Sequence, residues 1–183
     1  MSKFTVTVDI GNTKTKCSLF TEDGKILTSF ELEKLEKTLI DYKLNNSNTI
    51  FFISSVKEGP INFPYSFTNV STFFKDGHFL NMPVHYNTTV GIDRLVAAFY
   101  AFSKNDDSKL VIDSGTFTTV DSVGIQGFNG GFILPGLNLL ADAYKKGEKL
   151  NIPSTEMPEN MEEILGLFPQ TTQNAIHHGA FLS

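Results

Sequence analysis

Two segments of the sequence combine a carboxylate with a glycine turn and hydroxyl side chains. The first is Val8–Lys16, VDIGNTKTK, and the second is Val111–Asp121, VIDSGTFTTVD. In each segment an apolar run ends at an Asp, a Gly follows after one more residue, and mostly small polar residues come next. Such a turn places a carboxylate beside backbone N–H groups and hydroxyls, so it can hold a hydrated cation and a phosphate together.

The repetition of this pattern favours function over an ordinary turn. A single Asp-x-Gly followed by Asn or Thr is also a common tight-turn signal, because Gly and Asn tolerate positive φ. The two copies lie about one small domain apart in the sequence. The pair therefore indicates two halves of a duplicated unit that close on a nucleotide from opposite sides.

The elements around the first segment are expected in the order β-β-β-α-β. Period-two alternation predicts strands over Phe4–Val8, Thr15–Thr21 and Ile26–Leu32, and a charged helical pattern follows over Glu33–Leu44. The apolar run Ile50–Ser54 reads as a buried strand parallel to the first. This order is how a ribonuclease-H-like unit begins.

The middle of the chain has weaker patterns. It predicts a strand over Val70–Phe74 and a helix that starts near Gly91 and is capped by Thr88-Thr89. Lys104–Lys109, KNDDSK, is the clearest polar linker in the sequence. The expected domains are therefore residues 1–104 and 105–183.

The second half repeats the first half. Its patterns predict strands over Leu110–Asp113, Thr116–Val123 and Gly127–Leu134, then a helix over Leu137–Lys146 and a short helix over Glu159–Phe168. The final segment, 171–183, resembles a Thr-capped helix that stops in mid-course. We therefore expect the second domain to be incomplete.

Composition excludes several classes of function. A formal net charge of −5 over 183 residues argues against a protein that binds nucleic acids or anionic membranes, because both partners favour a basic face. The single Cys17 reads as a small core residue in a reducing compartment. The sequence shows neither a signal-peptide pattern nor an apolar run of membrane-spanning length, so we expect a cytoplasmic protein. The histidines show no metal-ligand spacing and are read as non-ligands: His78, His85, His177 and His178.

Five segments, taken in their order, resemble the motifs of type III pantothenate kinases. They are DIGNTKTK from Asp9, GIDR from Gly91, DSGTFTTVD from Asp113, GGFILPG from Gly130 and TTQNAIHHG from Thr171. The resemblance covers essentially the whole chain. It implies an α/β fold of two ribonuclease-H-like domains, as in the actin-like kinases, with an interdomain active-site cleft and a truncated second domain. It also implies transfer of the ATP γ-phosphoryl group to the 4′-hydroxyl of pantothenate, the entry step to coenzyme A.

The residues of the two Asp-x-Gly segments suit that reaction, because phosphoryl transfer needs charge neutralisation and in-line positioning. Asp9 is expected to hold Mg²⁺ through water, and the residues after it offer donors to phosphate oxygens. Lys14 and Lys16 share one face of a strand, where phosphate contact and simple solvent exposure are both open. The resemblance implies that Asp113 binds a monovalent cation, potassium or ammonium. The expected ATP contacts are Asp9, Ile10, Gly11, Asn12, Thr13, Lys14, Thr15, Lys16 and Thr116.

Asp93 is the expected general base, because a carboxylate can accept the hydroxyl proton while the bond to phosphorus forms. The alternative is that Asp93 and Arg94 make an ordinary ion pair at a helix start. Arg94 is expected to orient the acceptor through its planar fork. By resemblance, the pantothenate contacts are Tyr86, Gly91, Ile92, Asp93, Arg94 and Thr172.

Two other functions remain open at this point. One is a catalytically weak or inactive relative that acts as a nucleotide-binding accessory or regulatory protein. The other is an acetate or sugar kinase of the same fold. The resemblance further implies a homodimer, and apolar side chains near the end of the sequence would supply surface for it. Those side chains are Ala175, Ile176, Phe181 and Leu182.

Overall fold

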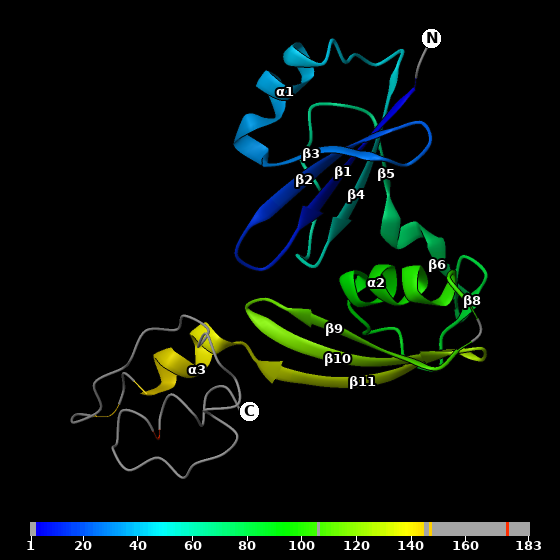
Figure 1. The fold of residues 1–183 in the computed structure, drawn as a ribbon, viewed down its shortest axis with the longest axis vertical. Helices are drawn as coiled ribbons and strands as arrows, with labels where there is room; N and C mark the ends of the chain where they lie inside the picture. Colours follow the sequence, from blue (N-terminus) through cyan, green and yellow to red (C-terminus); the bar gives the residue numbers. More distant parts are fainter. Residues whose placement is uncertain (1–2, 106, 145–146, 148–174, 176–183) are drawn as a thin grey trace. The chain divides into compact units, whose positions relative to one another are not determined.

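The computed structural model is a mixed α/β fold and describes residues 3–105, 107–144, 147 and 175 (Figure 1). The chain divides into two compact units. Unit 1 consists of Met1–Val111 with Asp121–Gly131, and unit 2 of Ile112–Val120 with Phe132–Ser183. The expected boundary between residues 104 and 105 stays a prediction.

A five-stranded sheet forms the first part of unit 1, with the strand order β3-β2-β1-β4-β5. Its first three strands pair antiparallel, whereas β4 runs parallel to β1 and β5 parallel to β4. The strands are β1 (Phe4–Ile10), β2 (Thr15–Thr21), β3 (Ile26–Glu31), β4 (Thr49–Ser55) and β5 (Phe67–Asn69). The predicted strands and the predicted parallel pairing of β1 with β4 are therefore confirmed.

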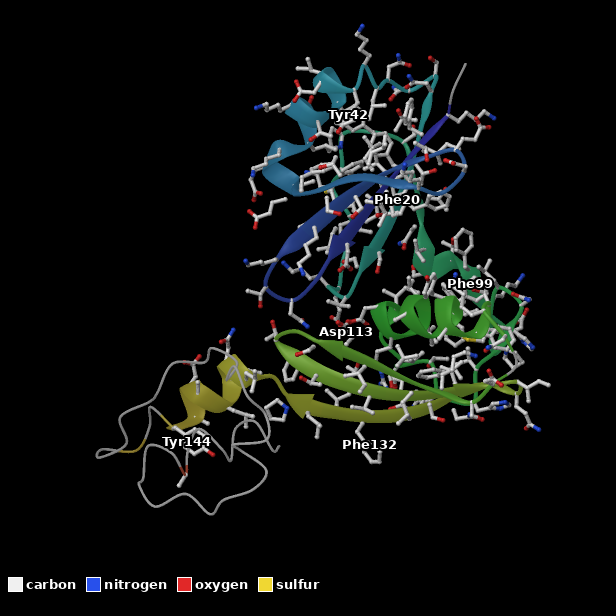
Figure 2. The ribbon with its side chains drawn as sticks, in the orientation of Figure 1. Phe20, Tyr42, Phe99, Asp113, Phe132 and Tyr144 are labelled. Atoms are coloured by element: carbon white, nitrogen blue, oxygen red, sulfur yellow. The ribbon has the colours of Figure 1, made fainter. Side chains whose placement is uncertain are left out.

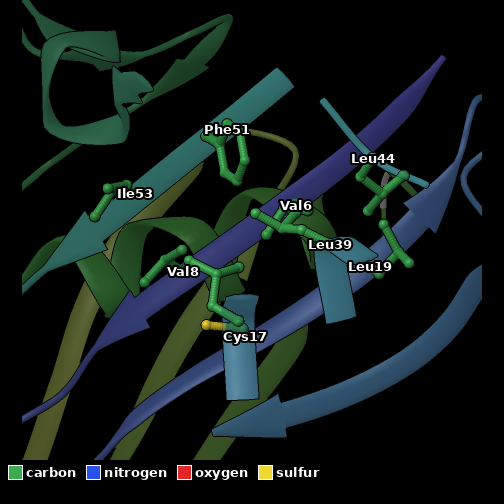
Figure 3. Close-up of a cluster of buried hydrophobic side chains, with 9 residues drawn as sticks. Val6, Val8, Cys17, Leu19, Leu39, Leu44, Phe51 and Ile53 are labelled. Carbon is green, nitrogen blue, oxygen red and sulfur yellow. The ribbon is translucent and has the colours of Figure 1, made fainter. Parts of the chain in front are cut away.

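Helix α1 (Leu35–Asp41) packs on one face of this sheet, over a core of apolar side chains from β1, β2 and β4 (Figure 3). The predicted helix is shorter than expected, because a 3-10 turn, η1 (Leu32–Lys34), precedes it. The chain leaves α1 through Lys43 at φ 55°, with the Leu44 N–H bonded to the Leu39 carbonyl at 2.7 Å. This is a left-handed helix end, which Gly usually provides.

The segment after β5 differs from the prediction. Val70–Phe73 forms a 3-10 helix, η2, instead of the predicted strand. The Asn69 Oδ1 accepts the Ser71 N–H at 3.0 Å, which caps the turn and competes with extended pairing. A small three-stranded sheet, β6-β7-β8, follows. Its strands are β6 (Phe74–Lys75), β7 (His78–Phe79) and β8 (Met82–Pro83).

Helix α2 (Ile92–Phe102) is the centre of a second hydrophobic core in unit 1. Its buried members come from β7, β8 and the residue after it, α2, β10 and β11: Phe79, Met82, Val84, Ile92, Leu95, Ala98, Val123 and Phe128. The predicted threonine cap is wrong, since Gly91 occupies the N-cap position without a side-chain hydrogen bond. The Thr89 hydroxyl instead bonds to the side chain of Asn87.

The last described elements are a three-stranded sheet of order β11-β10-β9 and helix α3. They are β9 (Lys109–Ser114), β10 (Phe117–Gly124), β11 (Gly127–Pro135) and α3 (Leu137–Tyr144). The three predicted strands are confirmed, and the predicted helix is confirmed as far as Tyr144. The helices expected over 159–168 and 171–183 lie outside the described residues. Within the described part of the chain, no helix is long and apolar enough to cross a membrane.

Candidate active site

The turn between β1 and β2 is closed by a hydrogen bond from the Gly11 N–H to the Lys14 carbonyl at 3.0 Å. The Gly11 N–H, predicted to donate to phosphate, is therefore used within the turn. Asn12 and Thr13 are exposed at its tip. The Val56 N–H donates to the Ile10 carbonyl at 3.1 Å, which holds the end of β4 beside the turn. The turn is thus a short, supported loop with polar side chains exposed.

A row of polar side chains crosses the sheet next to this turn. Strand pairing places Asp9 opposite Lys16 on β2 and opposite Ser54 on β4. Because their neighbours Val8, Cys17 and Ile53 point into the core under α1, these three residues lie on the other face of the sheet.

The Oγ of Ser54 is buried and has no hydrogen-bond partner among the residues that the structure describes. A buried hydroxyl usually has a partner, so this one has capacity for a ligand or water. The carboxylate of Asp9, the ammonium group of Lys16 and the hydroxyl of Ser54 therefore occupy one row, which suits a hydrated cation with a phosphate. The other lysine of this segment, Lys14, lies 4.0 Å from Glu31, a surface contact that contributes little.

Asp93 lies in the first turn of α2 and is half-buried. Its Oδ1 accepts the backbone N–H of Arg94 at 2.8 Å. A Cβ at Gly91 would lie 2.5 Å from that same oxygen, so the carboxylate occupies space that only glycine leaves open. The first turn of α2 thus holds the carboxylate in one place.

Arg94 does not point its guanidinium into solvent. Its Nε donates to both oxygens of the Asp121 carboxylate at 3.2 and 3.0 Å, and its Nη2 donates to Oδ1. Arg94 is 6% exposed and Asp121 is 1% exposed. The hydrogen bond to Asp121 raises the pKa of the guanidinium, although burial opposes that rise. The guanidinium was expected to orient the acceptor. In the structure it is bonded to a carboxylate of the protein itself.

Sequence reasoning gave Asp121 no role in the site. The available signal was its position, since it ends the second Asp-x-Gly segment, where the other exit-strand residues are Thr, Val and Phe. A carboxylate at an inward, buried position of a strand needs a cation nearby. The sequence does not show which cation that is, because Arg94 lies on another element.

Tyr86 lies beside the same guanidinium. The Arg94 Cζ is 5.3 Å from the Tyr86 ring centroid and 5.6 Å from that of Phe128. A Cβ at Gly130 would come within 2.8 Å of the Tyr86 ring, so this glycine of β11 leaves room for the tyrosine. The fold therefore brings Tyr86 beside Arg94, and Gly91 and Arg94 beside Asp93. Their contact with pantothenate stays a prediction.

The two described histidines bond to backbone carbonyls. His85 Nε2 contacts the Gln126 carbonyl at 2.8 Å, and the His85 N–H donates to the Phe128 carbonyl at 2.8 Å. His78 Nδ1 contacts the Asp76 carbonyl at 3.0 Å. His85 thus attaches the segment that carries Tyr86 to β11.

The second Asp-x-Gly turn belongs to unit 2. Asp113 is exposed near the end of β9 (Figure 2), and the Gly115 N–H donates to the Phe117 carbonyl at 3.0 Å. The Gly136 N–H donates to the Thr116 carbonyl at 3.0 Å, and a Cβ at Gly136 would overlap the carbonyl oxygens of Gly115 and Thr116. A carboxylate and backbone carbonyls are the hard oxygen donors that a potassium-like cation prefers. Thr172 lies outside the described residues.

Comparison with known proteins identifies the relatives of this chain. A model of the type III pantothenate kinase family matches residues 5–183. A type III pantothenate kinase of Desulforapulum autotrophicum is 30% identical over 181 residues, covering 87% of this chain and 68% of that protein. One of Persephonella marina is 28% identical over 197 residues, covering 95% and 74%.

A solved structure shows the same fold. It is that of a protein from Campylobacter jejuni assigned to the Baf family of transcriptional activators, with a TM-score of 0.58 and 22% identity. The match covers 97% of this chain and 74% of that one. The chain therefore spans about two thirds to three quarters of the length of these relatives.

Proposed function

Because the chain belongs to the type III pantothenate kinase family, we propose that it transfers the γ-phosphoryl group of ATP to the 4′-hydroxyl of pantothenate. The family is one of kinases, and membership supports the use of ATP and a place in coenzyme A biosynthesis. The single observation that carries the proposal is the family match over residues 5–183, which includes the carboxylate at the start of α2.

Asp93 is the proposed general base. In the transfer, the 4′-hydroxyl oxygen forms a bond to the γ-phosphorus while the bond from phosphorus to the β–γ bridging oxygen breaks, and ADP leaves. The hydroxyl proton passes to the Asp93 carboxylate. A carboxylate can accept this proton, because the hydroxyl becomes acidic as its bond to phosphorus forms. The hydrogen bond from the Arg94 N–H supports this role by fixing the direction of the carboxylate.

The β1–β2 turn is the proposed site for the phosphates of ATP. Asp9 would hold Mg²⁺, which neutralises phosphate charge when bound, and Asn12 and Thr13 would donate to phosphate oxygens. The row of Asp9, Lys16 and the buried Ser54 hydroxyl supports this assignment, since it joins an anionic ligand to phosphate-binding groups. ATP contacts by Ile10, Gly11, Lys14 and Thr15 stay predictions. Because the Gly11 N–H is bonded within the turn, Gly11 would contribute through the shape of the turn.

Asp113 and Thr116 are proposed to bind the monovalent cation and ATP, respectively. The support is the oxygen donor set around the second turn. The homodimer and the contacts with pantothenate rest on the family resemblance; the contacts are those of Tyr86, Gly91, Ile92, Arg94 and Thr172. The cytoplasmic location stays a prediction from the composition and patterns of the sequence. The action of both turns on one nucleotide likewise stays a prediction from the repeated pattern.

The test is the replacement Asp93→Asn, assayed by coupled ADP release from the full chain with pantothenate as the acceptor. The amide keeps the size and the hydrogen bond but accepts no proton, so we expect turnover to fall by roughly two to four orders of magnitude. Thermal unfolding should be nearly unchanged. Asp76→Asn is the matched control, because Asp76 is exposed and its left-handed backbone at φ 52° accepts Asn.

Three outcomes would contradict the proposal. Asp93→Asn retaining more than about a tenth of the activity would mean that Asp93 is not the base. ADP release with acetate or glucose, and none with pantothenate, would assign another acceptor. Nucleotide binding without turnover on any of these acceptors would identify a non-catalytic relative.

A further inference from the structure

Asp121 and Arg94 are the only charged side chains that are buried among the described residues. Removing two charges from water costs several kcal/mol for each ion, and an apolar pair of similar volume often folds as well or better. Stability alone is therefore a weak reason for this pair. A stronger reason is that one member of the pair, Arg94, directly follows Asp93 in α2.

The pair connects β10 to the first turn of α2. Two donors of the guanidinium engage the Asp121 carboxylate, which fixes both the position and the rotation of the planar group. The rings of Tyr86 and Phe128 lie 5.3 and 5.6 Å from its centre and restrict it further. The guanidinium of Arg94 is consequently restricted both in position and in rotation.

The backbone of Arg94 is in turn the group that holds Asp93. Its N–H donates to Asp93 Oδ1 at 2.8 Å. The N-cap of α2 is Gly91, which offers no side-chain hydrogen bond, so this first turn depends on other contacts for its position. A chain of bonds therefore runs from β10 through the Arg94 side chain and its backbone to the Asp93 carboxylate.

We propose that Asp121 is a positioning residue for phosphoryl transfer, which acts through Arg94 to fix the first turn of α2 and with it the carboxylate of Asp93. The proposal rests on the proposed function, in which Asp93 accepts the proton. A displacement of a reacting group by about 1 Å can cost roughly a hundredfold in rate. Loss of Asp121 should therefore reduce turnover more than it reduces nucleotide binding.

The experiment compares Asp121→Asn and Asp121→Glu with the wild-type chain, each assayed well below its own unfolding temperature. For Asp121→Asn we expect kcat with pantothenate to fall roughly 10- to 100-fold, while KM for ATP stays within about threefold. Asp121→Glu keeps the charge and should recover part of kcat. Tyr65→Phe is the control, since it removes a hydrogen bond to the Glu36 carboxylate on α1 and should leave kcat unchanged.

Amide hydrogen exchange separates positioning from general stability. In Asp121→Asn the Arg94 amide should exchange roughly tenfold faster or more, while amides in the second half of α2, around Phe99, keep their protection. An unchanged kcat in a folded Asp121→Asn protein would overturn the proposal. So would an equal loss of protection along the whole of α2, which indicates a purely structural role.

Two further arms keep the proposal testable. If Asp121→Asn does not fold, Arg94→Lys takes its place, because it keeps a cation opposite Asp121 but loses the planar fork. Since Arg94 is itself a proposed pantothenate contact, the deciding readout is then faster exchange of the backbone amide at position 94 with unchanged protection around Phe99, and unchanged exchange at position 94 would overturn the proposal. If the wild-type chain does not phosphorylate pantothenate, the proposed function fails by itself. Exchange at the Arg94 amide then decides whether Asp121 anchors α2.

Discussion

The two Asp-x-Gly segments carry the same pattern, but their exit strands meet different surroundings. Cys17 follows Asp9 at the spacing at which Asp121 follows Asp113, and each is 1% exposed. Cys17 packs among the apolar side chains under α1 (Figure 3), where burial, and next the charge of Glu33, raise its pKa to about 11. Asp121 is paired with Arg94 instead.

This difference shows how one local pattern can serve two structural roles. In the first copy the inward face of the exit strand completes a hydrophobic core, and the polar residues lie on the opposite face of the sheet. In the second copy the exit strand buries a charge, which has to be compensated by a cation from another element. That cation is supplied by α2, beside the candidate base. The last residue of the second copy, Asp121, is therefore bonded to the helix that carries Asp93.

The largest effect is expected from Cys17→Asp, which gives the first copy the residue of the second copy without its partner. An unpaired carboxylate in an apolar core should lower the free energy of unfolding by roughly 3–5 kcal/mol, about the cost of leaving one member of a buried ion pair alone. Urea unfolding measures the change, with Cys17→Ala as the control for lost volume. A cost no larger than that of Cys17→Ala would mean that the two burial sites are equivalent.

A smaller effect is expected when the two turn carboxylates are neutralised one at a time. Asp9→Asn should reduce turnover roughly 10- to 100-fold at low Mg²⁺ and recover partly at high Mg²⁺, because hard cations need anionic oxygen ligands. Asp113→Asn should abolish stimulation by potassium or ammonium over sodium and leave the Mg²⁺ dependence as it was. The measurement is ADP release across both salt series. Wild-type activity that is indifferent to the monovalent cation would contradict the role of Asp113.

The last effect, which is confined to alkaline pH, concerns the pH dependence of stability near Cys17. The folded-state pKa of its thiol is raised from 9.0 to about 11, so the folded form retains a proton that the unfolded chain loses. The resulting stability is complete below about pH 9 and is lost as the pH rises toward about 11. The wild-type chain should therefore lose roughly 1–3 kcal/mol more than Cys17→Ala across that range. Parallel unfolding curves of the two proteins over these pH values would show that the thiol does not titrate differently on folding.

Local features of the sequence predicted much of the first sheet. Strands β1, β2 and β3 follow from alternation of apolar and polar residues, and β4 follows from a continuous apolar run. The turn at Gly11 follows from residues that favour tight turns. The 3-10 helix at Val70 was missed, because its signal is a set of local hydrogen bonds from Ser71 and Thr72 to Asn69 and not a periodic pattern. The helix start at Gly91 was placed correctly, but the cap was assigned to the wrong residues, since no side chain caps it.

The sequence by itself determined which chemical groups the chain carries: two Asp-x-Gly turns, the Asp93 carboxylate and the family to which their order belongs. Only the tertiary structure decided what Arg94 does. Its partner Asp121 lies 27 residues away on another element, and no periodicity or turn signal relates the two positions. A pairing of this kind arises when a helix packs on a sheet and a buried charge must find its counterion, because an unpaired charge in that core would cost more than the packing supplies.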